Sequence, residues 1–509
     1  MRALTGGARL MTGAEMLRIH DTMLAILDDP GLEVQLPERG LRRLADAGLR
    51  VDLAARRVRL DPEPVLETIR QFSGASSPEI DENGSTNPPQ PLRLPTTIRA
   101  NIGSTHGFIF DVERWDLRDA TRQDFINFTK IARSLEGVAP RVGMMPQDVP
   151  PEVAYVHRTA LSAIHDEAPG GSANGREDGV WVTRVLQAAG ILPEGAPPVQ
   201  SSHMQPTGAL MLSARAAEDM LLQADEGRLT YLAPCGFAGG NHPVTRPGAL
   251  AQVYAELFGC NTVSRLLVAP PHNEFTPRAV GCDQLIMDLR RGAFATATPE
   301  GLLMRLGMRQ MSGDFYRFPG GSGFIIATTT DSPVPGIQTS LEWALGTASE
   351  LMAGVYTHDE DVTVTVKTLG RLHANLALCA EQVLIHYEGL QWLRRLFAGP
   401  EVNDTTLALD AVRAVGPGGE FVTADHTLAN YRHEFWFPTL LHRGAWGDYV
   451  ANGQRTPLDL ATERVREILK QDLQPVLDDD RCREVQRVVQ EAERALLGHT
   501  TGVMVWPAV

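Results

Sequence analysis

The sequence predicts an α/β fold of parallel strands that alternate with helices, and three observations point to it. Short apolar runs recur along the chain, most are followed by polar or glycine-rich residues, and a helical pattern comes next. Units of about 30 to 45 residues, repeated about seven or eight times, favour a closed (β/α)8 TIM barrel over an open sheet. The expected strands are 138–145, 199–204, 229–235, 266–269, 293–297, 324–330 and 362–366, and the helices between them include 212–223, 247–258, 300–312 and 337–353.

Two flanking regions complete the predicted organisation. Residues 1–96 form an N-terminal helical cap with a short hairpin, and they end in a connector rich in Ser, Pro, Asn and Gly. The (β/α)8 barrel is expected to span 97–455 as the catalytic domain. Residues 456–509 form a C-terminal helical extension, whose apolar face carries Ala461, Val465, Ile468 and Leu469.

The clearest strand–loop–helix unit lies at 324–352. A β-branched run at 324–330 is followed by turn-forming residues and then by a helix with an apolar stripe that is expected to pack on the core. The stripe contains Ile337, Leu341, Ala344, Leu345, Ala348 and Met352. Catalytic groups collect at the carboxyl ends of barrel strands, where Asp331 stands, with Gln338 and Glu342 one turn apart just after it. We therefore predict catalytic roles for Asp331 and Gln338, and for His358 in the polar cluster that follows the helix.

Composition excludes several classes of protein. The 509 residues carry a net charge of −15, which argues against binding to a nucleic-acid backbone. No apolar run is long enough to cross a membrane and the N-terminus lacks a signal-peptide pattern, so the cytoplasm is the expected compartment. The five cysteines are scattered without a C-x-x-C pair, which predicts neither a disulfide framework nor a metal site.

Several motifs, taken together, resemble a known family. They are 103–111, 236–245 with Glu256 after it, 288–292 with 299–300, 330–331 with Gln338, and the C-terminal block 416–419, 425–428, Arg432 and 436–438. Over nearly its whole length the chain resembles the trimethylamine methyltransferase family, in the branch without pyrrolysine that includes glycine betaine:corrinoid methyltransferases. The resemblance implies a TIM barrel that passes a methyl group from a quaternary amine to the cobalt(I) of a separate corrinoid protein.

The resemblance also implies how the cofactor and partners are arranged. The chain lacks the Asp-x-His-x-x-Gly corrinoid signature, so no tightly bound cofactor is expected and the corrinoid would arrive on a corrinoid-binding partner. The substrate would be a small cation, and the resemblance further implies a homo-oligomer.

A quaternary ammonium is recognised by aromatic faces and carboxylates. The candidate substrate-binding residues are His106, Phe108, Phe110, Tyr231, Tyr356, Glu381 and His386, with Trp343 as a further aromatic and Asp331 as a second counter-charge. Each has a structural alternative. Phe108 and Phe110 also suit a half-buried strand, His386 a core histidine, His358 a solvated cluster and Gln338 a helix start.

Other functions stay open at this point. The same barrel could use a sulfonium or another methylated substrate, or a methyl acceptor other than corrinoid. A non-catalytic binding protein for methylated amines is a third possibility. Methylation of the cobalt of a supplied corrinoid protein separates the first function from the others.

Overall fold

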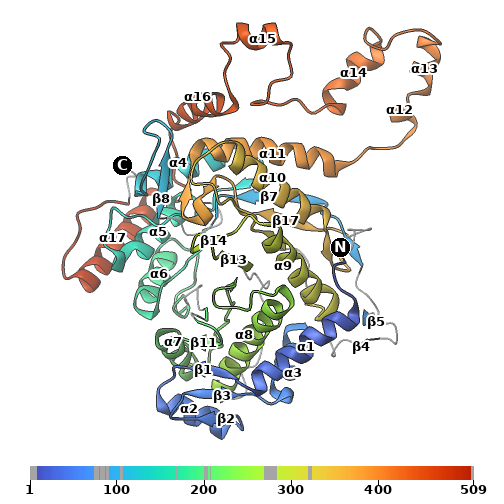
Figure 1. The fold of residues 1–509 in the computed structure, drawn as a ribbon. Helices are drawn as coiled ribbons and strands as arrows, with labels where there is room; N and C mark the ends of the chain where they lie inside the picture. The colour runs from blue at the N-terminus through green and yellow to red at the C-terminus, as the bar shows by residue number, and fades with distance from the viewer. Residues whose placement is uncertain are drawn as a thin grey trace.

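The computed structural model describes residues 9–73, 79–80, 86–87, 91–103, 107–166, 169–199, 205–206, 208–268, 284–318 and 324–505. Within them, helices and strands form a body with two large hydrophobic cores (Figure 1). One core surrounds a parallel sheet, and the other surrounds the long buried helix α8, Arg246–Leu267. The mixed α/β class that the sequence predicts is thereby confirmed.

The N-terminal region folds into helices around a small sheet, as the sequence predicts. Strands β2 and β3 form the expected hairpin, and β1 joins β3 on one side and the distant β11 on the other. Helices α1 and α3 pack against α8, so this region shares the second core. The elements are α1 (Gly13–Asp28), β1 (Leu32–Val34), α2 (Glu38–Asp46), β2 (Arg50–Asp52), β3 (Arg57–Arg59), α3 (Pro62–Ser73) and β11 (Met211–Leu212).

The central sheet contains four parallel strands in the order β10-β7-β17-β15. The last strand of the predicted series, β17, pairs with β7, which lies ahead of that series at the start of the predicted barrel domain. The two strands pair from Thr97 with Thr363 to Ala100 with Val366. Among the described strands this ladder does not continue into a closed barrel, because β12, β13 and β14 form a separate sheet. The strands are β7 (Thr97–Asn101), β10 (Val138–Ala139), β12 (Gly236–Ala238), β13 (Gln284–Asp288), β14 (Ala293–Ala295), β15 (Phe324–Ile326) and β17 (Thr363–Val366).

One expected strand, 229–235, is absent because side chains of α8 accept the hydrogen bonds that its backbone amides would donate to a neighbouring strand. The amide of Thr230 donates to Ser264 Oγ at 3.0 Å, and the amide of Leu232 donates to Asn261 Oδ1 at 3.1 Å. These side-chain acceptors replace a neighbouring strand, so the segment runs extended without joining a sheet.

One further strand prediction is wrong, one is right in position but not in orientation, and one lies largely outside the described residues. The run 266–269 begins inside the last turn of α8. The helix extends to Leu267, whose buried side chain packs on the second core. Residues 293–295 pair antiparallel with β13 and form a hairpin, not a parallel strand. The strand expected at 199–204 falls on positions of which only the first is described.

Helix α10 (Ile337–Met352) forms as predicted but buries the opposite face. Its buried residues are Thr339, Trp343, Gly346, Thr347, Glu350 and Leu351. Most of the predicted apolar stripe is exposed instead, with Ile337 88% exposed, whereas Ala348 is half-buried against the first core. Gly346 explains the choice, because a Cβ there would lie 2.2 Å from Thr328 Cγ2, so only a glycine allows this close approach to the strand end.

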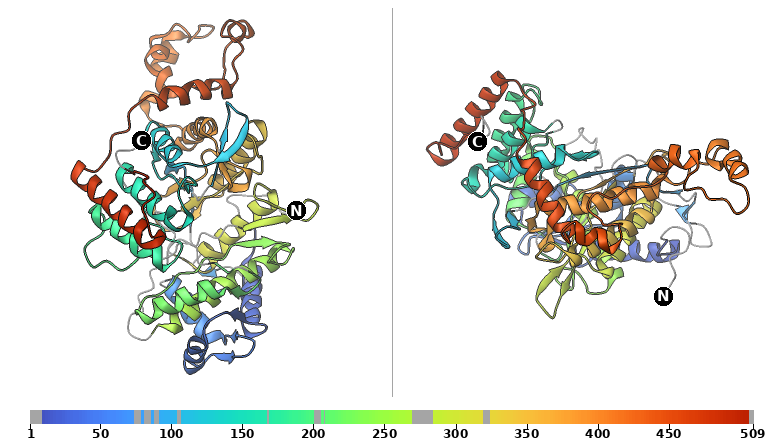
Figure 2. Two further views of the ribbon diagram at one scale, coloured as in Figure 1. Left: turned by 90° about the vertical axis from the view of Figure 1, so that its left-hand side faces the viewer. Right: turned by 90° about the horizontal axis from the view of Figure 1, so that it is seen from above.

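The C-terminal extension covers the first core. Helix α16 (Pro457–Leu469) buries Ala461, Val465 and Ile468, which confirms most of the predicted face, and α17 (Asp479–Leu497) packs on α5 and α6. Residues 400–455, which we call the arm, project away from the body in all the views of Figures 1 and 2. The arm contains α12 (Asp404–Leu407), α13 (Leu409–Val415), α14 (Asp425–Glu434) and α15 (Trp446–Ala451).

The remaining elements complete the body. They are β4 (Glu79–Ile80), β5 (Thr86–Asn87), β6 (Leu92–Arg93), β8 (Phe108–Asp111), β9 (Asp116–Asp119), α4 (Arg122–Arg133), α5 (Pro151–His165), α6 (Arg176–Ala188), α7 (Ala214–Asp225), α9 (Pro299–Gln310), a π-helical turn (Met311–Phe315), β16 (Val355–Tyr356), β18 (Arg371–Leu372), a 3₁₀ turn (His373–Asn375), β19 (Ala377–Leu378) and α11 (Ala380–Ala398). None of the helices in the described ranges is both long and apolar enough to cross a membrane.

Candidate active site at the strand ends

The carboxylate of Glu342 holds the end of β15 against α10. Thr330 Oγ1 donates to Glu342 Oε2 at 2.6 Å, and the Asp331 amide donates to the same oxygen at 2.9 Å. Gln338 Nε2 donates to Glu342 Oε1 at 2.9 Å. The predicted residues Asp331 and Gln338 therefore meet at Glu342, at the carboxyl end of a parallel strand.

The carboxylate of Asp331 ties a second segment to the same strand end. Its Oδ1 accepts hydrogen bonds from the amide and the hydroxyl of Thr296, both at 2.7 Å, and its Oδ2 accepts from the amide of Ala297 at 3.2 Å. These partners lie in the connection between β14 and α9. Because three protein donors occupy the carboxylate, its geometry suits a group that positions the strand-end loop.

A buried ion cluster lies at Thr328, three residues before Asp331. Glu350 Oε1 accepts hydrogen bonds from Thr328 Oγ1 at 2.5 Å and from Arg305 Nε at 3.0 Å, and Glu350 Oε2 accepts from Arg309 Nη2 at 3.1 Å. Burial lowers the pKa of Arg309 to about 10, and the charge of Glu350 opposes that effect. The arginine therefore stays charged at neutral pH and needs its carboxylate partner.

The loop after β17 joins the ends of two other strands. The guanidinium of Arg371, which is buried, donates to the carbonyl of Gly103 beyond β7. Residues 373–375 all have positive φ, between 51° and 75°, and the amides of His373 and Ala374 donate to the carbonyls of Ser332 and Thr330. Strained backbone of this kind persists where surrounding contacts fix it and clusters at functional sites.

Glu381, at the start of α11, is more buried than Asp331, the other predicted counter-charge. Burial raises the pKa of its carboxyl group, and the nearby acids Asp111 and Glu113 act in the same direction. The thiol of Cys379 donates to Glu381 Oε2 at 3.4 Å. Phe110 belongs to the same small core as Cys379, so one predicted aromatic and one predicted carboxylate share a neighbourhood.

Phe108 and Phe110 stand two residues apart in β8 and so lie on the same face of the strand, but they differ in burial. Phe110 is buried, and its ring meets Trp115 edge to face with centroids 5.3 Å apart. Phe108 is half exposed. Of the two rings, only that of Phe110 is therefore covered by the core.

The other predicted aromatics lie elsewhere in the described structure. Tyr231 packs in the second core beside Phe72, with ring centroids 6.0 Å apart. Tyr356 is buried in β16, where its side chain covers Gly313. No aromatic cage that includes both tyrosines forms among the described residues.

Trp343 and His386 form a buried stack inside the first core. Their rings lie nearly parallel at 4.6 Å, and Trp343 Nε1 donates to Thr368 Oγ1 at 2.9 Å. The amide of Gly370 donates to His386 Nδ1 at 3.1 Å, and burial lowers the pKa of His386 to about 3. His386 is thus a neutral histidine of the core.

Two predicted histidines do not join the strand-end cluster. His358 follows β16 and is exposed. His106 lies outside the described residues.

A second buried polar cluster stands beside β12, in the segment 236–245. His242 Nε2 lies 3.3 Å from Glu256 Oε2, and both side chains are fully buried. Glu256 Oε1 accepts from Gln252 Nε2 at 2.9 Å and from the amide of Leu210 at 3.0 Å. A glutamate in the otherwise apolar middle of α8 is the sequence signal of this cluster.

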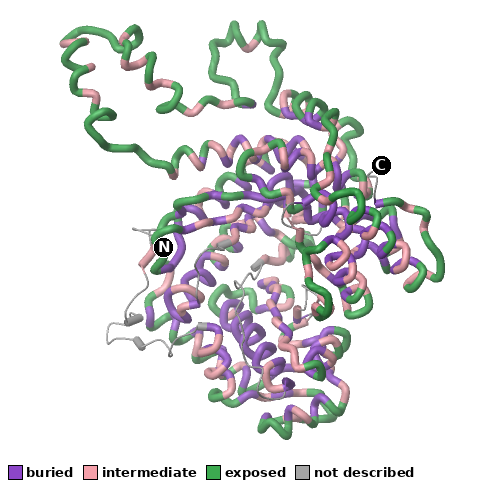
Figure 3. The backbone as a smooth tube through the Cα atoms, turned by 180° about the vertical axis from the view of Figure 1, so that it is seen from behind, coloured by how far each residue is buried: buried purple, intermediate pink, exposed green. Residues whose placement is uncertain are grey.

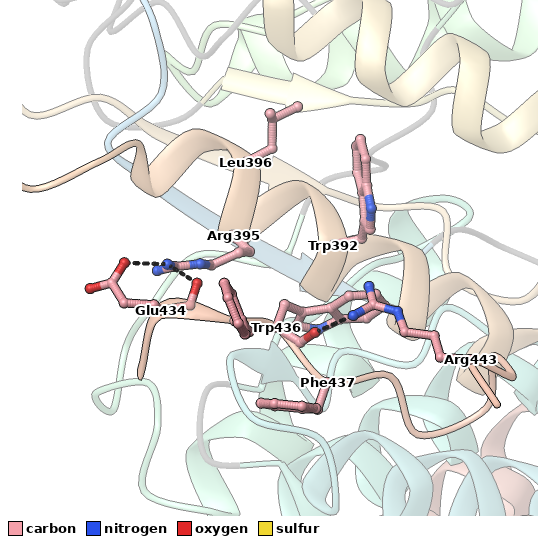
Figure 4. Close-up of a pocket in the computed structure, with 8 residues that line it drawn as sticks. Trp392, Arg395, Leu396, Glu434, Trp436, Phe437 and Arg443 are labelled. Atoms are coloured by element: carbon pink, nitrogen blue, oxygen red, sulfur yellow. Dashed lines mark hydrogen bonds and ion pairs between the residues drawn. The ribbon is translucent and has the colours of Figure 1, made fainter. Parts of the chain in front are cut away.

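A cavity of about 400 Å³ opens at the base of the arm, apart from the strand ends (Figure 4). Trp436 forms one wall, with the guanidinium of Arg443 5.1 Å from its ring centre. Another wall comes from Trp392, which lies about 17 Å along α11 from Glu381. The cavity is therefore separate from the strand-end site. In the described part of the chain, no group of three or more His, Cys, Asp or Glu side chains is placed to hold a metal ion.

The chain is similar to curated methyltransferases along nearly its whole length. It is 24% identical over 486 residues to the trimethylamine methyltransferase MttB of Desulfitobacterium hafniense (strain DSM 10664 / DCB-2), covering 94% of this chain and 93% of the relative. It is 26% identical over 479 residues to the glycine betaine methyltransferase of Desulfitobacterium hafniense (strain Y51), covering 92% and 94%.

A solved structure, the monomethylamine methyltransferase MtmB of Methanosarcina barkeri, aligns over 96% of this chain and 92% of its own. The two chains are 12% identical and superpose with a TM-score of 0.39. The family model for trimethylamine methyltransferase (MTTB) matches residues 5–496. The resemblance seen in the sequence motifs is confirmed, and the chain belongs to the trimethylamine methyltransferase (MTTB) family.

Proposed function

We propose that this methyltransferase moves a methyl group from a quaternary amine, of the glycine betaine kind, to the cobalt(I) of a separate corrinoid protein. The observation that carries the proposal is the family match over residues 5–496, in a chain without pyrrolysine. The similarity to a glycine betaine methyltransferase supports the quaternary amine as the substrate class.

The reaction asks little proton chemistry of the protein. The methyl–nitrogen bond breaks, nitrogen keeps the electron pair, and a neutral tertiary amine leaves, so no proton has to be transferred. The partner's corrinoid supplies the nucleophile that accepts the methyl group. This chain must bind a permanent cation, orient one methyl group and keep water away.

The strand-end cluster supplies groups suited to these tasks. Glu381 would supply counter-charge near Phe110, because a bound cation compensates a carboxylate that burial otherwise makes costly to ionise. Asp331, Gln338 and Glu342 would fix the loop after β15, and Arg371 would fix the loop after β7. The predicted roles of His106, Phe108, Tyr231, Tyr356, His358 and His386 have no such geometric support among the described residues.

We further propose that the parallel strands close into a (β/α)8 barrel and that the protein acts in the cytoplasm. Support for the barrel comes from β7, at the start of the predicted barrel domain, which pairs parallel with β17, the last predicted strand, as happens when the two ends of a (β/α)8 barrel meet. Cys260, Cys379 and Cys482 are buried as thiols, which suits a reducing compartment.

Product analysis with a panel of methylated compounds tests the substrate class. The purified enzyme is incubated with a cobalt(I) corrinoid protein and with glycine betaine, trimethylamine or a sulfonium carboxylate in turn. We expect demethylated product only from the quaternary amine and only when the corrinoid protein is present. Product from the sulfonium alone, or product without the corrinoid protein, would favour the alternative methyltransferases, and binding without product would favour a binding protein.

A further inference from the structure

The arm has no core of its own. Its helices α12, α13, α14 and α15 contain 4, 7, 10 and 6 residues, and none of these residues, all of which the structure describes, is buried (Figure 3). Helices this short are marginal in water without tertiary packing. Something outside the arm must therefore stabilise its helices.

The base of the arm is firmly attached to the body. Buried Glu388 on α11 accepts hydrogen bonds from the amide of Thr439 at 2.7 Å, from its hydroxyl at 2.8 Å and from the amide of Leu440 at 3.0 Å. Arg395, also on α11, donates to the carbonyl of Glu434 at 2.5 Å. The attachment fixes where the arm leaves the body.

The arm exposes large apolar side chains. Those more than 60% exposed are Val402, Leu407, Val422, Leu428, Phe435 and Trp446. Of the 7 Trp, 8 Tyr and 16 Phe in the chain, seven lie in the arm, about twice the average share. Exposed apolar clusters enriched in aromatic residues are typical of protein interfaces.

The body carries a second uncovered apolar surface, the outer face of α10. Ile337, Leu341, Leu345 and Met352 are each more than half exposed along one side of this helix. The arm of the same chain leaves this face uncovered. Each chain therefore carries two unpartnered apolar surfaces on separate parts of its structure.

We propose that the arm of one copy of this chain covers the outer face of α10 on a second copy. A twofold exchange of this kind covers both surfaces at once and closes the assembly, whereas a different partner on either surface would leave the other exposed. The exposed apolar side chains of the arm and of α10 together offer an area of the same order as the roughly 800 Å² that each partner contributes to a standard interface. The inference does not depend on the substrate or on the methyl acceptor.

Light scattering of the full-length chain after gel filtration tests this assembly. We expect the wild-type protein to have the mass of a dimer or of a multiple of it. Leu428→Glu in α14 and Leu345→Glu in α10 should each reduce the mass toward that of the monomer. The matched control is Leu289→Glu in the β13–β14 turn, because Leu289 is 70% exposed and Leu428 is 73% exposed. The control should keep the wild-type mass, and circular dichroism should show all three variants folded.

Hydrogen exchange distinguishes direct contact between the two surfaces from an indirect effect. In Leu345→Glu, the amides of α14 should lose protection although the substitution lies on another element, and in Leu289→Glu they should keep it. A monomeric wild type overturns the proposal, as does a Leu428→Glu variant of unchanged mass. Unchanged mass or unchanged α14 protection in Leu345→Glu removes α10 as the surface that the arm covers.

Discussion

Asp331 combines a strand-end position with a fully occupied carboxylate, so its substitution should disturb both stability and turnover. In Asp331→Asn the remaining oxygen can still accept from Thr296, but the amide NH₂ faces the N–H of Ala297. We expect the free energy of unfolding to fall by about 1–3 kcal/mol and kcat to fall at least about tenfold, through displacement of the loop.

Asp52→Asn is the matched control for Asp331→Asn. A single oxygen of Asp52 accepts from the amides of Ala54 and Ala55 in an exposed turn, and asparagine keeps that oxygen. Denaturant unfolding and steady-state kinetics measure both variants. Unchanged turnover in Asp331→Asn would show that this carboxylate does not support catalysis.

His386 should make the enzyme less stable in mild acid. Its pKa is about 3 in the folded protein, below the ordinary value of 6.5, so its contribution to stability is complete above pH 6.5. As the pH falls below 6.5, the unfolded chain gains a proton that the folded chain does not take up. Between pH 6.5 and pH 5 we expect His386 to cost about 2 kcal/mol of unfolding free energy.

His386→Gln isolates this effect, because glutamine keeps an acceptor for the amide of Gly370 and does not titrate. Other histidines with lowered pKa, such as His165, titrate equally in both proteins. Denaturant midpoints measured across this pH range should fall less steeply in His386→Gln than in the wild type. Parallel slopes would mean that His386 does not remain neutral in the fold.

At the scale of elements, the contact between α10 and β15 depends on the ion cluster of Glu350. In Glu350→Gln the buried Arg309 loses its counter-charge, and breaking such a pair costs about 3–5 kcal/mol. Glu38→Gln, which removes one partner of the exposed Arg42 pair, should have little measurable effect. Equal denaturant midpoints for the two variants would show that the cluster does not hold α10.

The α10 helix also shows where reasoning from sequence succeeds and where it fails. Spacing predicted the helix, but the larger apolar side chains do not mark its buried face. Gly346 allows Thr328 to approach closely, and Glu342 and Glu350 accept hydrogen bonds from polar groups at the strand end. Glu342 and Glu350 are eight residues apart and therefore share a face, which was the available signal. The buried face is determined by polar contacts between α10 and the segment after β15. Such contacts between elements cannot be predicted from the spacing of apolar residues within one helix.

At the scale of the whole molecule, alternating apolar runs predicted the α/β class and the strands β10, β15 and β17. The missing strand at 229–235 could not be predicted, because its amides bond to Ser264 and Asn261, which lie about thirty residues away. Aromatic residues were the weakest guide to the site. Trp343 and Tyr231 fill cores, and sequence alone does not distinguish a core ring from a cation-binding ring.

The central claim is methyl transfer to cobalt, and one absorbance measurement tests it most directly. Purified enzyme is added to a reduced corrinoid protein, shown beforehand to be competent, and glycine betaine is then supplied. The account predicts loss of the cobalt(I) band at a rate proportional to enzyme concentration, with no loss when the enzyme is omitted. A persistent cobalt(I) band with glycine betaine and with every other quaternary amine tried would contradict the account.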